Sequence, residues 1–289
     1  MKKVFKYFSV IIIILVFTSC GKYGYNFVDG YQEGDKESSP ILTDTTMNVA
    51  DKSLYAKARI FPGLVGDNVR RIVDTTITFD MDYLSVTKED LKVSQTPKPI
   101  YSTGLYAPAG ENIRIVVPAG VIGLTVQVGV HTDDLSGQEP LRRDAIIYTK
   151  KELFPGVNYV KNLYGGTILL WTNNSRLNPV NIQFSGAVRS PDFILGESNV
   201  QDWLAEVEAT AVPWIEARSK HVIFSIPRSL IVSYSGEASH IDEALVQWNE
   251  IYVKDFYDWM GLVENTSDSK NSYPNLPERA VLDIQPSTG

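Results

Sequence analysis

Alternating apolar and polar positions run through the middle of the chain and predict β-strands. The clearest run is 124–131, where leucine or valine fills every even position and a polar residue or glycine fills every odd one. Successive side chains of a strand point to opposite faces, so the odd positions are expected to face away from the core. Further runs that predict short strands lie at 75–79, 113–117, 167–171 and 180–184. Turns rich in glycine, proline and asparagine separate these runs, so residues 55–190 predict an antiparallel β-sandwich.

Helical spacing replaces this alternation in the last third of the chain. Ser198 with Gln201 three residues later is a capping-box pattern, which predicts a helix over residues 198–210. Apolar residues at helical spacing predict a second helix from Ser239, its expected cap, to Gly261. Apolar runs that follow the two helices predict two short strands, at 221–226 and 280–284. The fold class predicted for the chain is therefore mainly β, with the beginning of an α/β layer at its C-terminal end.

Aromatic residues make up 11% of the chain and fall into two groups. One group is predicted to pack in the core: Trp203, Trp214, Trp248 and Trp259. Trp248 and Trp259 lie on the apolar stripe of a predicted helix, where an aromatic residue usually packs. The other group falls in the β region: Tyr101, Tyr106, Tyr148, Tyr159, Tyr164 and Trp171. These flat rings are suited to stacking against sugars, but core packing is the alternative that we favour for each single ring.

The N-terminal segment has the pattern of an export signal. Lysines precede an apolar stretch from Val10 to Phe17, and Thr18 and Ser19 then lead to Cys20. This order predicts a lipoprotein signal peptide at residues 1–19, with the thiol of the cysteine acylated after cleavage. A transmembrane anchor is the weaker alternative, because the apolar stretch is too short to span about 30 Å of hydrocarbon. An ordinary signal peptide with a chance cysteine is the other alternative.

The segment that follows the signal predicts a tether. Residues 21–50 are rich in Gly, Ser, Thr, Asp and Lys, which favours a flexible connection between the lipidated Cys20 and the folded body. Attachment to a membrane is expected through this lipid alone. The expected location is the outer membrane, with the protein displayed at the cell surface.

Composition narrows the classes of function. A hydrophobic fraction of 44% is that of a packed globular protein. Cys20 is the only cysteine, so no disulfide framework can support the fold. Removing the signal segment takes away three lysines and no acidic residue, which changes the formal net charge from −7 to −10. A nucleic-acid partner is therefore not expected, because phosphate contacts need a basic surface.

One polar cluster is a candidate site. His131, Asp133 and Asp134 follow the clearest strand, where an imidazole and two carboxylates could bind a cation or a sugar. The alternative, which we favour, is a turn in which one of the aspartates accepts hydrogen bonds from nearby backbone N–H groups.

Several segments resemble one family in order and spacing: 102–111 (STGLYAPAGE), 116–118, 124–135 (LTVQVGVHTDDL), 155–158, 162–166, 214–227, the Trp248 helix, 277–279 and 283–285. Together they resemble the enhancin-like zinc metallopeptidases, which include viral enhancins and bacterial mucin-degrading proteases. The resemblance covers residues 55–289. It implies an accessory β-sandwich packed on a zinc peptidase domain, and a partner that is a mucin or another O-glycosylated protein.

The family's catalytic signature is H-E-x-x-H, whose two histidines hold the zinc while the glutamate activates water. This chain has only His131, His221 and His240, and none has a second histidine four residues away. No catalytic residue and no metal ligand can therefore be carried over, and no cofactor is expected in this chain. We expect a fragment or a short relative that is inactive alone; the alternative is a stand-alone surface protein that binds glycans or glycoproteins. The expected parts are 1–19, 20–50, a β-sandwich at 51–190 and an α/β lead-in to the peptidase domain at 191–289.

Overall fold

The computed structural model describes residues 44–53, 55, 60–264 and 266–286. The chain divides into residues 1–44 and residues 45–289, and the fold below is that of the second unit. The signal segment 1–19, Cys20 and most of the predicted tether lie outside the described residues. No helix in the described ranges is long and apolar enough to cross a membrane.

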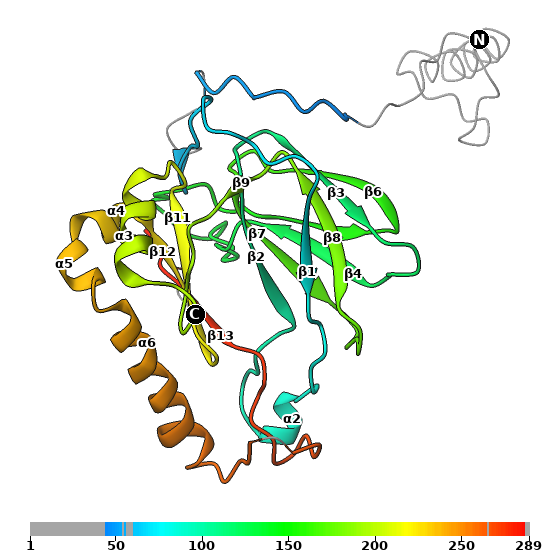
Figure 1. Cartoon of the computed structure of the whole chain (residues 1–289), viewed down its shortest axis with the longest axis vertical. Coiled ribbons are helices and arrows are strands. Elements are labelled where there is room, and N and C mark those ends of the chain that lie inside the picture. The colour runs from blue at the N-terminus through cyan, green and yellow to red at the C-terminus, as the bar shows by residue number, and fades with distance from the viewer. Residues whose placement is uncertain (1–43, 54, 56–59, 265, 287–289) are drawn as a thin grey trace, which may run out of the picture. The chain divides into compact units, whose positions relative to one another are not determined.

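Two antiparallel sheets pack face to face and form the sandwich (Figure 1). The first contains, in spatial order, β1 (Thr75–Phe79), β8 (Val180–Ser185), β3 (Asn112–Val117) and β6 (Gly156–Lys161). The second sheet contains, again in spatial order, β5 (Thr149–Leu153), β4 (Leu124–Val128), β7 (Gly166–Thr172), β2 (Ile100–Ala107) and β9 (Val188–Arg189). Apolar residues of both sheets share one core, with Ile115 and Ile182 from the first and Val126 and Leu170 from the second fully buried. The predicted β-sandwich is confirmed.

A glycine pair places the strands of the second sheet close together. Gly165 and Gly166 both have positive φ, at 71° and 136°. A Cβ at Gly165 would lie 2.5 Å from the carbonyl oxygen of Ala107, and one at Gly166 would lie 2.6 Å from the Cα of Gly129. Only glycine fits here, because the backbones of neighbouring strands approach too closely for a side chain.

A third, mixed sheet follows the sandwich. Its order is β10 (Phe193–Ile194), β11 (Trp214–Arg218), β12 (Val222–Pro227) and β13 (Glu278–Val281). The outer pairs are parallel and the central pair is antiparallel. In Figure 1 this sheet lies beside the sandwich, with α4, α5 and α6 beyond it. The helical segments are α2 (Lys88–Leu91), α3 (Val200–Ala209), α4 (Arg228–Ser233), α5 (Ser235–Ala238), α6 (Ile241–Glu250) and the π-helical η3 (Ile251–Tyr257). The predicted change to mixed α/β structure is confirmed, while the boundary between 190 and 191 stays a prediction.

The cap predicted for the first helix is off by one residue. Asn199 caps α3, because its side-chain oxygen accepts hydrogen bonds from the backbone N–H groups of Gln201 (2.9 Å) and Asp202 (3.1 Å). The hydroxyl of Ser198 instead accepts from the backbone N–H of Ile194 at 2.9 Å. It therefore closes the turn after β10, and the capping-box pattern was misread.

The second helix also differs from the prediction. It begins at Ile241, and the Ser239 hydroxyl donates to the carbonyl of Gly236 instead of capping it. The α-helix ends at Glu250 and a π-helical segment continues to Tyr257. A π-helix has more residues per turn, so an apolar stripe spaced for an α-helix leaves the buried face.

Only two of the four tryptophans predicted for the core are there. Trp203 and Trp214 are 3% and 4% exposed, and each belongs to a hydrophobic cluster. Trp248 is 42% exposed and Trp259 is 83% exposed, which makes that prediction wrong for both. The change to π-helical geometry after α6 explains why Trp259 leaves the stripe that the sequence suggested.

The outer face of the five-stranded sheet is largely covered, contrary to the alternation argument. Gln127 and His131 are both buried, although they occupy odd positions of the 124–131 run, while Thr125 stays half-buried. The mixed sheet explains the difference, since the ring of Trp214 on β11 packs edge-to-face against His131 with 4.5 Å between ring centres. Both faces of this part of the sheet are therefore interior.

Candidate functional site

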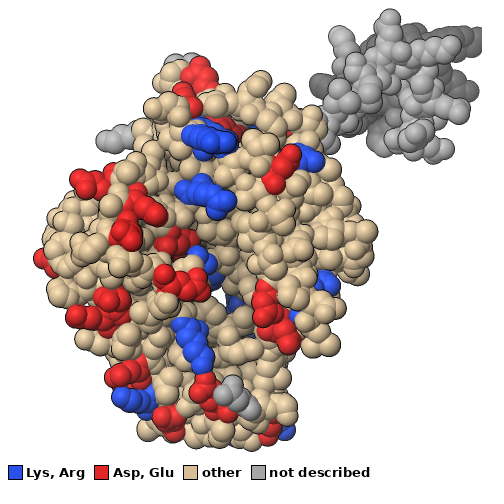
Figure 2. All heavy atoms as spheres, viewed as in Figure 1, with Lys and Arg blue, Asp and Glu red and all other residues tan. Residues whose placement is uncertain are grey.

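A cleft separates the outer face of the five-stranded sheet from β13 and encloses about 270 Å³. We call it the sheet cleft. One wall consists of sandwich residues, namely Gln95–Lys98, Ile100, Gln127, Val130, Thr132, Lys150, Leu169 and Trp171. The other wall consists of Ser225 on β12 with Pro277, Glu278, Arg279 and Val281. Figure 2 shows a hollow in this region, with acidic and basic side chains mixed around it.

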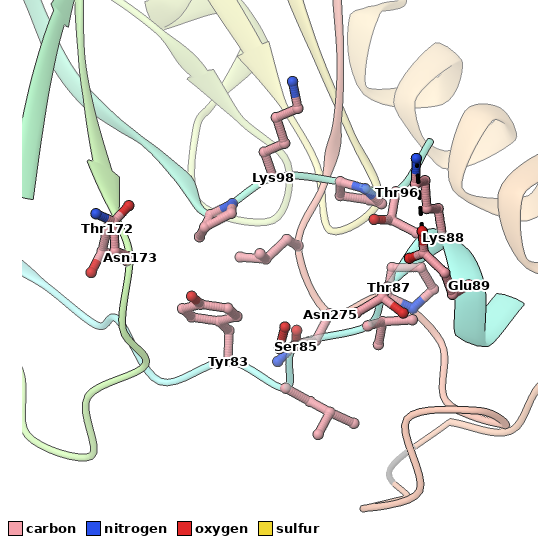
Figure 3. Close-up of a pocket in the computed structure, with 16 residues that line it drawn as sticks. Tyr83, Ser85, Thr87, Lys88, Glu89, Thr96, Lys98, Thr172, Asn173 and Asn275 are labelled. Atoms are coloured by element: carbon pink, nitrogen blue, oxygen red, sulfur yellow. Dashed lines mark ion pairs between the residues drawn. The ribbon is translucent and has the colours of Figure 1, made fainter. Parts of the chain in front are cut away.

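A second hollow of about 420 Å³ adjoins the first, because Thr96, Pro97 and Lys98 line both. We call it the loop pocket (Figure 3). Tyr83, Thr172 and Asn173 lie on one side of it, while Thr87 and Lys88 at the start of α2 lie on the other. Its lining is dominated by hydroxyl groups, amides and prolines, which suits a polar, uncharged ligand surface.

The start of α2 is held in place by a capping box. The backbone N–H of Asp90 donates to the Thr87 hydroxyl oxygen at 3.1 Å, and the backbone N–H of Thr87 donates to the Asp90 carboxylate at 3.2 Å. Both hydrogen bonds satisfy N–H groups that the helix end would otherwise leave unpaired. The loop that forms this wall of the loop pocket is thereby locally fixed.

Trp171 is the aromatic residue of the sheet cleft. Its indole N–H donates to the Gln127 side-chain oxygen at 3.0 Å, and the Gln127 amide in turn donates to the Gly129 carbonyl at 2.7 Å. This chain of hydrogen bonds fixes the ring orientation, because it ties the indole through the buried Gln127 amide to the backbone. Trp171 therefore presents a rigid, half-exposed surface.

Two lysines accompany that ring. The Lys150 ammonium lies 3.9 Å from its centre and the Lys98 ammonium lies 5.8 Å from it. In Figure 3 the Lys98 side chain points away from Tyr83 and out of the loop pocket. Partial burial of the ammonium, together with the like charge of Lys98, lowers the pKa of Lys150.

A network of buried charges holds β13 against β2. The Arg279 guanidinium donates to a Glu216 carboxylate oxygen at 2.8 Å and to the Ser102 hydroxyl at 2.8 Å. It also donates to the Ile100 carbonyl at 3.2 Å. Arg279 therefore ties β13, on one wall of the sheet cleft, to β2 of the sandwich.

A further carboxyl, that of Asp192, adjoins this network. It accepts hydrogen bonds from the Ser190 hydroxyl at 2.6 Å and from the backbone N–H of Glu216 at 3.0 Å. Burial, followed by the nearby Glu216 carboxylate, raises the pKa of Asp192 to about 7. Arg218 lies 3.7 Å away and offsets part of this shift.

The polar cluster singled out from the sequence does not line either hollow. The His131 ring is buried, and its Nε2 lies 3.0 Å from the Leu282 carbonyl, to which it donates as the Nε2–H tautomer. Burial lowers its pKa. Asp134 is exposed and accepts from the Ser136 backbone N–H at 2.8 Å, which is the local turn geometry. Asp133 is half-buried between them.

The six aromatic residues of the β region do not form a platform. Tyr106 is fully buried and Tyr101 packs against the sandwich core. The Tyr164 hydroxyl donates to Asp144 at 2.5 Å. Only Trp171 of the six lines the sheet cleft. Tyr148 lies beside the same lysine, with 5.8 Å between its ring centre and the Lys150 ammonium, and Tyr159 is half-buried on β6.

The zinc implied by the resemblance has no suitable ligands in the described part of the chain. No three side chains of the ligating types His, Cys, Asp and Glu gather there at distances that would hold a metal ion. His221 packs edge-to-face on Tyr257, and His240 is exposed beside Glu243 on α6. The residues present therefore do not fit the metal.

Comparison with known proteins places the chain in a family. Residues 83–185 match the N-terminal domain of M60-like peptidases, and residues 186–289 match peptidase M60, enhancin and enhancin-like. A TRPM8 channel-associated factor homolog of Danio rerio is 30% identical over 193 residues, which are 65% of this chain and 20% of that protein. TRPM8 channel-associated factor 1 of Homo sapiens is 28% identical over 192 residues, which are 65% of this chain and 19% of that protein. The chain thus spans about a fifth of the length of these curated relatives.

Solved structures show the same fold. The ZmpB metallopeptidase from Clostridium perfringens matches with a TM-score of 0.59 and 20% identity, over 74% of this chain and 46% of that one. The M60 catalytic domain of ZmpC from Clostridium perfringens, solved in complex with the sialyl T antigen, matches with a TM-score of 0.57 and 19% identity, over 72% and 44% of the two chains. Since the two family matches follow one another across residues 83–289, this chain belongs to the family of M60-like, enhancin-like peptidases.

Proposed function

We propose that this chain is the non-catalytic N-terminal region of an enhancin-like metallopeptidase that acts on mucins and other O-glycosylated proteins. The observation that carries the proposal is the order of the two family matches, an M60-like N-terminal domain followed directly by M60 sequence. The M60 catalytic domain of ZmpC was solved in complex with the sialyl T antigen, which supports a glycosylated substrate. In this function the chain positions the protease on the glycoprotein.

The two adjoining hollows provide the surface for this role. A glycoprotein presents sugars beside an extended peptide, and a ligand of that kind needs hydrogen-bonding groups together with a flat ring. The loop pocket offers hydroxyls and amides, and the sheet cleft offers the fixed ring of Trp171. Because both share the segment Thr96–Lys98, one ligand can contact both.

The chain alone is proposed to bind without cleaving. Its 289 residues contain no H-E-x-x-H sequence, and its three histidines are at positions 131, 221 and 240. The test is a binding measurement with purified protein and immobilised mucin, before and after enzymatic removal of O-glycans. We expect the protein to bind mucin and to lose this binding once the O-glycans are removed. We also expect no EDTA-sensitive cleavage of mucin, even when zinc is added. Equal binding to the deglycosylated mucin, or EDTA-sensitive cleavage by the chain alone, would contradict the proposal.

Export as a lipoprotein is part of the same proposal. Cys20 after an apolar segment is the residue expected to carry the lipid, at the outer membrane and cell surface. The Cys20→Ser variant should move from the membrane fraction to the soluble fraction of the envelope. A variant that stays in the membrane fraction would rule out this anchor.

A second candidate function is that of a stand-alone surface lipoprotein that binds glycans or glycoproteins. It is favoured by one observation, namely that curated relatives matching 65% of this chain carry the name of a channel-associated factor and not of a peptidase. The coding sequence that follows Gly289 distinguishes the two: H-E-x-x-H in it favours the peptidase region, and a stop codon favours the stand-alone protein.

A further inference from the structure

Lys98 and Lys150 are two cations that share one aromatic neighbour. Their ammonium groups lie 5.8 Å and 3.9 Å from the centre of the Trp171 ring. Within the described ranges, neither comes within ion-pair distance of a carboxylate, whereas several other lysines form such pairs: Lys52 with Glu111, Lys88 with Glu89, Lys220 with Glu264 and Lys254 with Glu250. The cleft therefore holds positive charge that the fold does not neutralise.

The position of the two lysines is set by different parts of the fold. Lys150 lies on β5, directly opposite Gln127 of β4, and Lys98 lies in the segment that leads into β2. Bringing like charges to one ring costs free energy unless something offsets it. A ring face attracts an ammonium group only weakly at an exposed site, so an anion would be the stronger partner for the two lysines.

The opposite wall contributes little charge to oppose an anion. Glu278 is the only carboxylate among the described residues that line the sheet cleft, and burial raises its pKa. Arg279 is already paired with Glu216 on the side of the buried network. The Thr132 and Ser225 hydroxyls complete the lining with neutral hydrogen-bonding groups.

We propose that the sheet cleft binds an anionic saccharide residue, with its carboxylate or sulfate between Lys98 and Lys150 beside Trp171. The shared chemistry is one negative group on a sugar ring, and either source of charge satisfies it. The proposal rests on the proposed function, since a glycoprotein is what would present such a sugar. It assigns acidic-sugar recognition to the sandwich side of the groove.

The test measures binding of methyl glycosides to the full chain by calorimetry. One arm uses a carboxylate (N-acetylneuraminic acid and glucuronic acid), a second uses a sulfate (galactose 6-sulfate), and methyl galactoside is the neutral control. At least one anionic arm should bind ten or more times as tightly as the neutral control, and raising the salt from 50 to 500 mM should weaken that binding. The arm that binds identifies the source of the charge. If neither the carboxylate nor the sulfate glycosides bind more tightly than methyl galactoside, the inference is overturned.

Variants assign the binding to this cleft. Lys150→Met and Lys98→Met should each weaken the anionic glycoside at least fivefold. Lys151→Met is the matched control, because the Lys151 ammonium donates to the Tyr159 carbonyl at 2.7 Å and does not line the cleft. Glu278→Gln should tighten binding, since it removes the only lining carboxylate. Unchanged affinity in the double variant of Lys98 and Lys150, with circular dichroism like that of the parent, would overturn the assignment.

The outcomes separate this inference from the function on which it rests. Mucin binding that anionic glycosides do not inhibit would leave the proposed function standing and remove the inference. Binding of anionic glycosides without any binding of mucin would support the anion site and contradict the proposed function. If neither mucin nor the anionic glycosides bind, the proposed function and the inference are both wrong.

Discussion

The guanidinium of Arg143 and the carboxylate of Asp283 form a two-point ion pair between residues 140 positions apart in sequence. The N–O distances are 3.1 Å from Nε and 2.8 Å from Nη2, and the Arg143 side chain has no exposed surface. The remaining nitrogen donates to the backbone carbonyls of Asp144 and Ala145. The pair ties a loop of the sandwich to the segment after β13, and so fixes the far end of the wall that closes the sheet cleft.

Removing the acidic partner should be strongly destabilising. Asp283→Asn leaves a buried guanidinium without its counter-charge, which costs about 3–5 kcal/mol. Urea unfolding followed by tryptophan fluorescence measures the loss. The double change of Arg143→Met with Asp283→Leu should recover most of it, because an apolar pair carries no desolvation penalty. A double variant as unstable as Asp283→Asn alone would show that packing, and not the orphaned charge, is responsible.

The buried Asp192 carboxyl should make stability fall as the pH rises toward neutrality. Its pKa is raised from 3.8 to about 7, so the folded protein holds this proton more tightly than the unfolded chain does. Its contribution is complete below about pH 3.8 and is lost as the pH rises through 7, at up to about 1.4 kcal/mol per pH unit. Asp192→Asn should flatten the dependence of the unfolding free energy on pH between 4 and 7. Parallel profiles for variant and parent would contradict this.

His131 should act in the opposite direction. Burial lowers its pKa below 6.5, so the folded protein releases this proton while the unfolded chain keeps it. Its contribution is therefore present above pH 6.5 and is lost as the pH falls through the lowered value. His131→Phe keeps the edge-to-face contacts with Trp214 and Phe61 but cannot titrate. At pH 7 the variant should be about 1 kcal/mol less stable than the parent, because it lacks the hydrogen bond to Leu282. This difference in stability should shrink between pH 7 and pH 5, since only the parent loses the His131 contribution. Denaturant midpoints at both pH values measure it, and an unchanged difference would refute the prediction.

Close approach of backbones should make Gly166 intolerant of a side chain. A Cβ there would lie 2.6 Å from the Cα of Gly129, while a Cβ at Gly120 would meet nothing within 4 Å, although both residues have positive φ. Gly120→Ala should therefore cost only the conformational strain of about 1–2 kcal/mol. Gly166→Ala should cost clearly more, measured as the change in thermal midpoint. Equal costs would mean that the strands separate without penalty.

Strand positions could be predicted because burial of one face leaves a period of two. In β3, Ile113, Ile115 and Val117 are all buried, as their spacing indicates. The same rule failed for Gln127 and His131, since a polar residue on an odd position is read as exposed. Both are buried because the fold supplies partners for them, and the one for His131 lies 151 residues away. The pattern of apolar and polar residues around His131 contains no information on a partner so far away in the sequence.

The helical part of the chain shows a second limit of prediction from sequence spacing. The spacing from Ile241 onward is helical, but nothing in it distinguishes α-helical from π-helical turns. Trp259 consequently falls outside the buried face, where it is 83% exposed. The cap at α3 shows the same limit at a finer scale, because Ser198 and Asn199 are both good capping residues and tertiary contacts decide between them.

The candidate site could be predicted only in part. Trp171 is among the rings that the sequence singles out for sugar stacking, and it is the one that lines the sheet cleft. Lys98 and Lys150 were missed, because the register of β4 with β5 and the course of the segment before β2 bring them to that ring. The candidates His131 and Asp134 were suggested by adjacency in sequence, which does not place side chains in one hollow.

The most direct test of the account observes Trp171 itself. In nitrogen-15 correlation spectra, the indole N–H signals of the five tryptophans can be assigned by substitution and followed during titration with an O-glycosylated mucin peptide. Trp203 is the internal control, because it is buried against Phe193 with its N–H on the Pro191 carbonyl. The account predicts a saturable shift of the Trp171 signal with the glycopeptide, no shift with the unglycosylated peptide and a constant Trp203 signal. A Trp171 signal that stays in place while the glycopeptide binds would contradict the claim that this groove receives the glycoprotein.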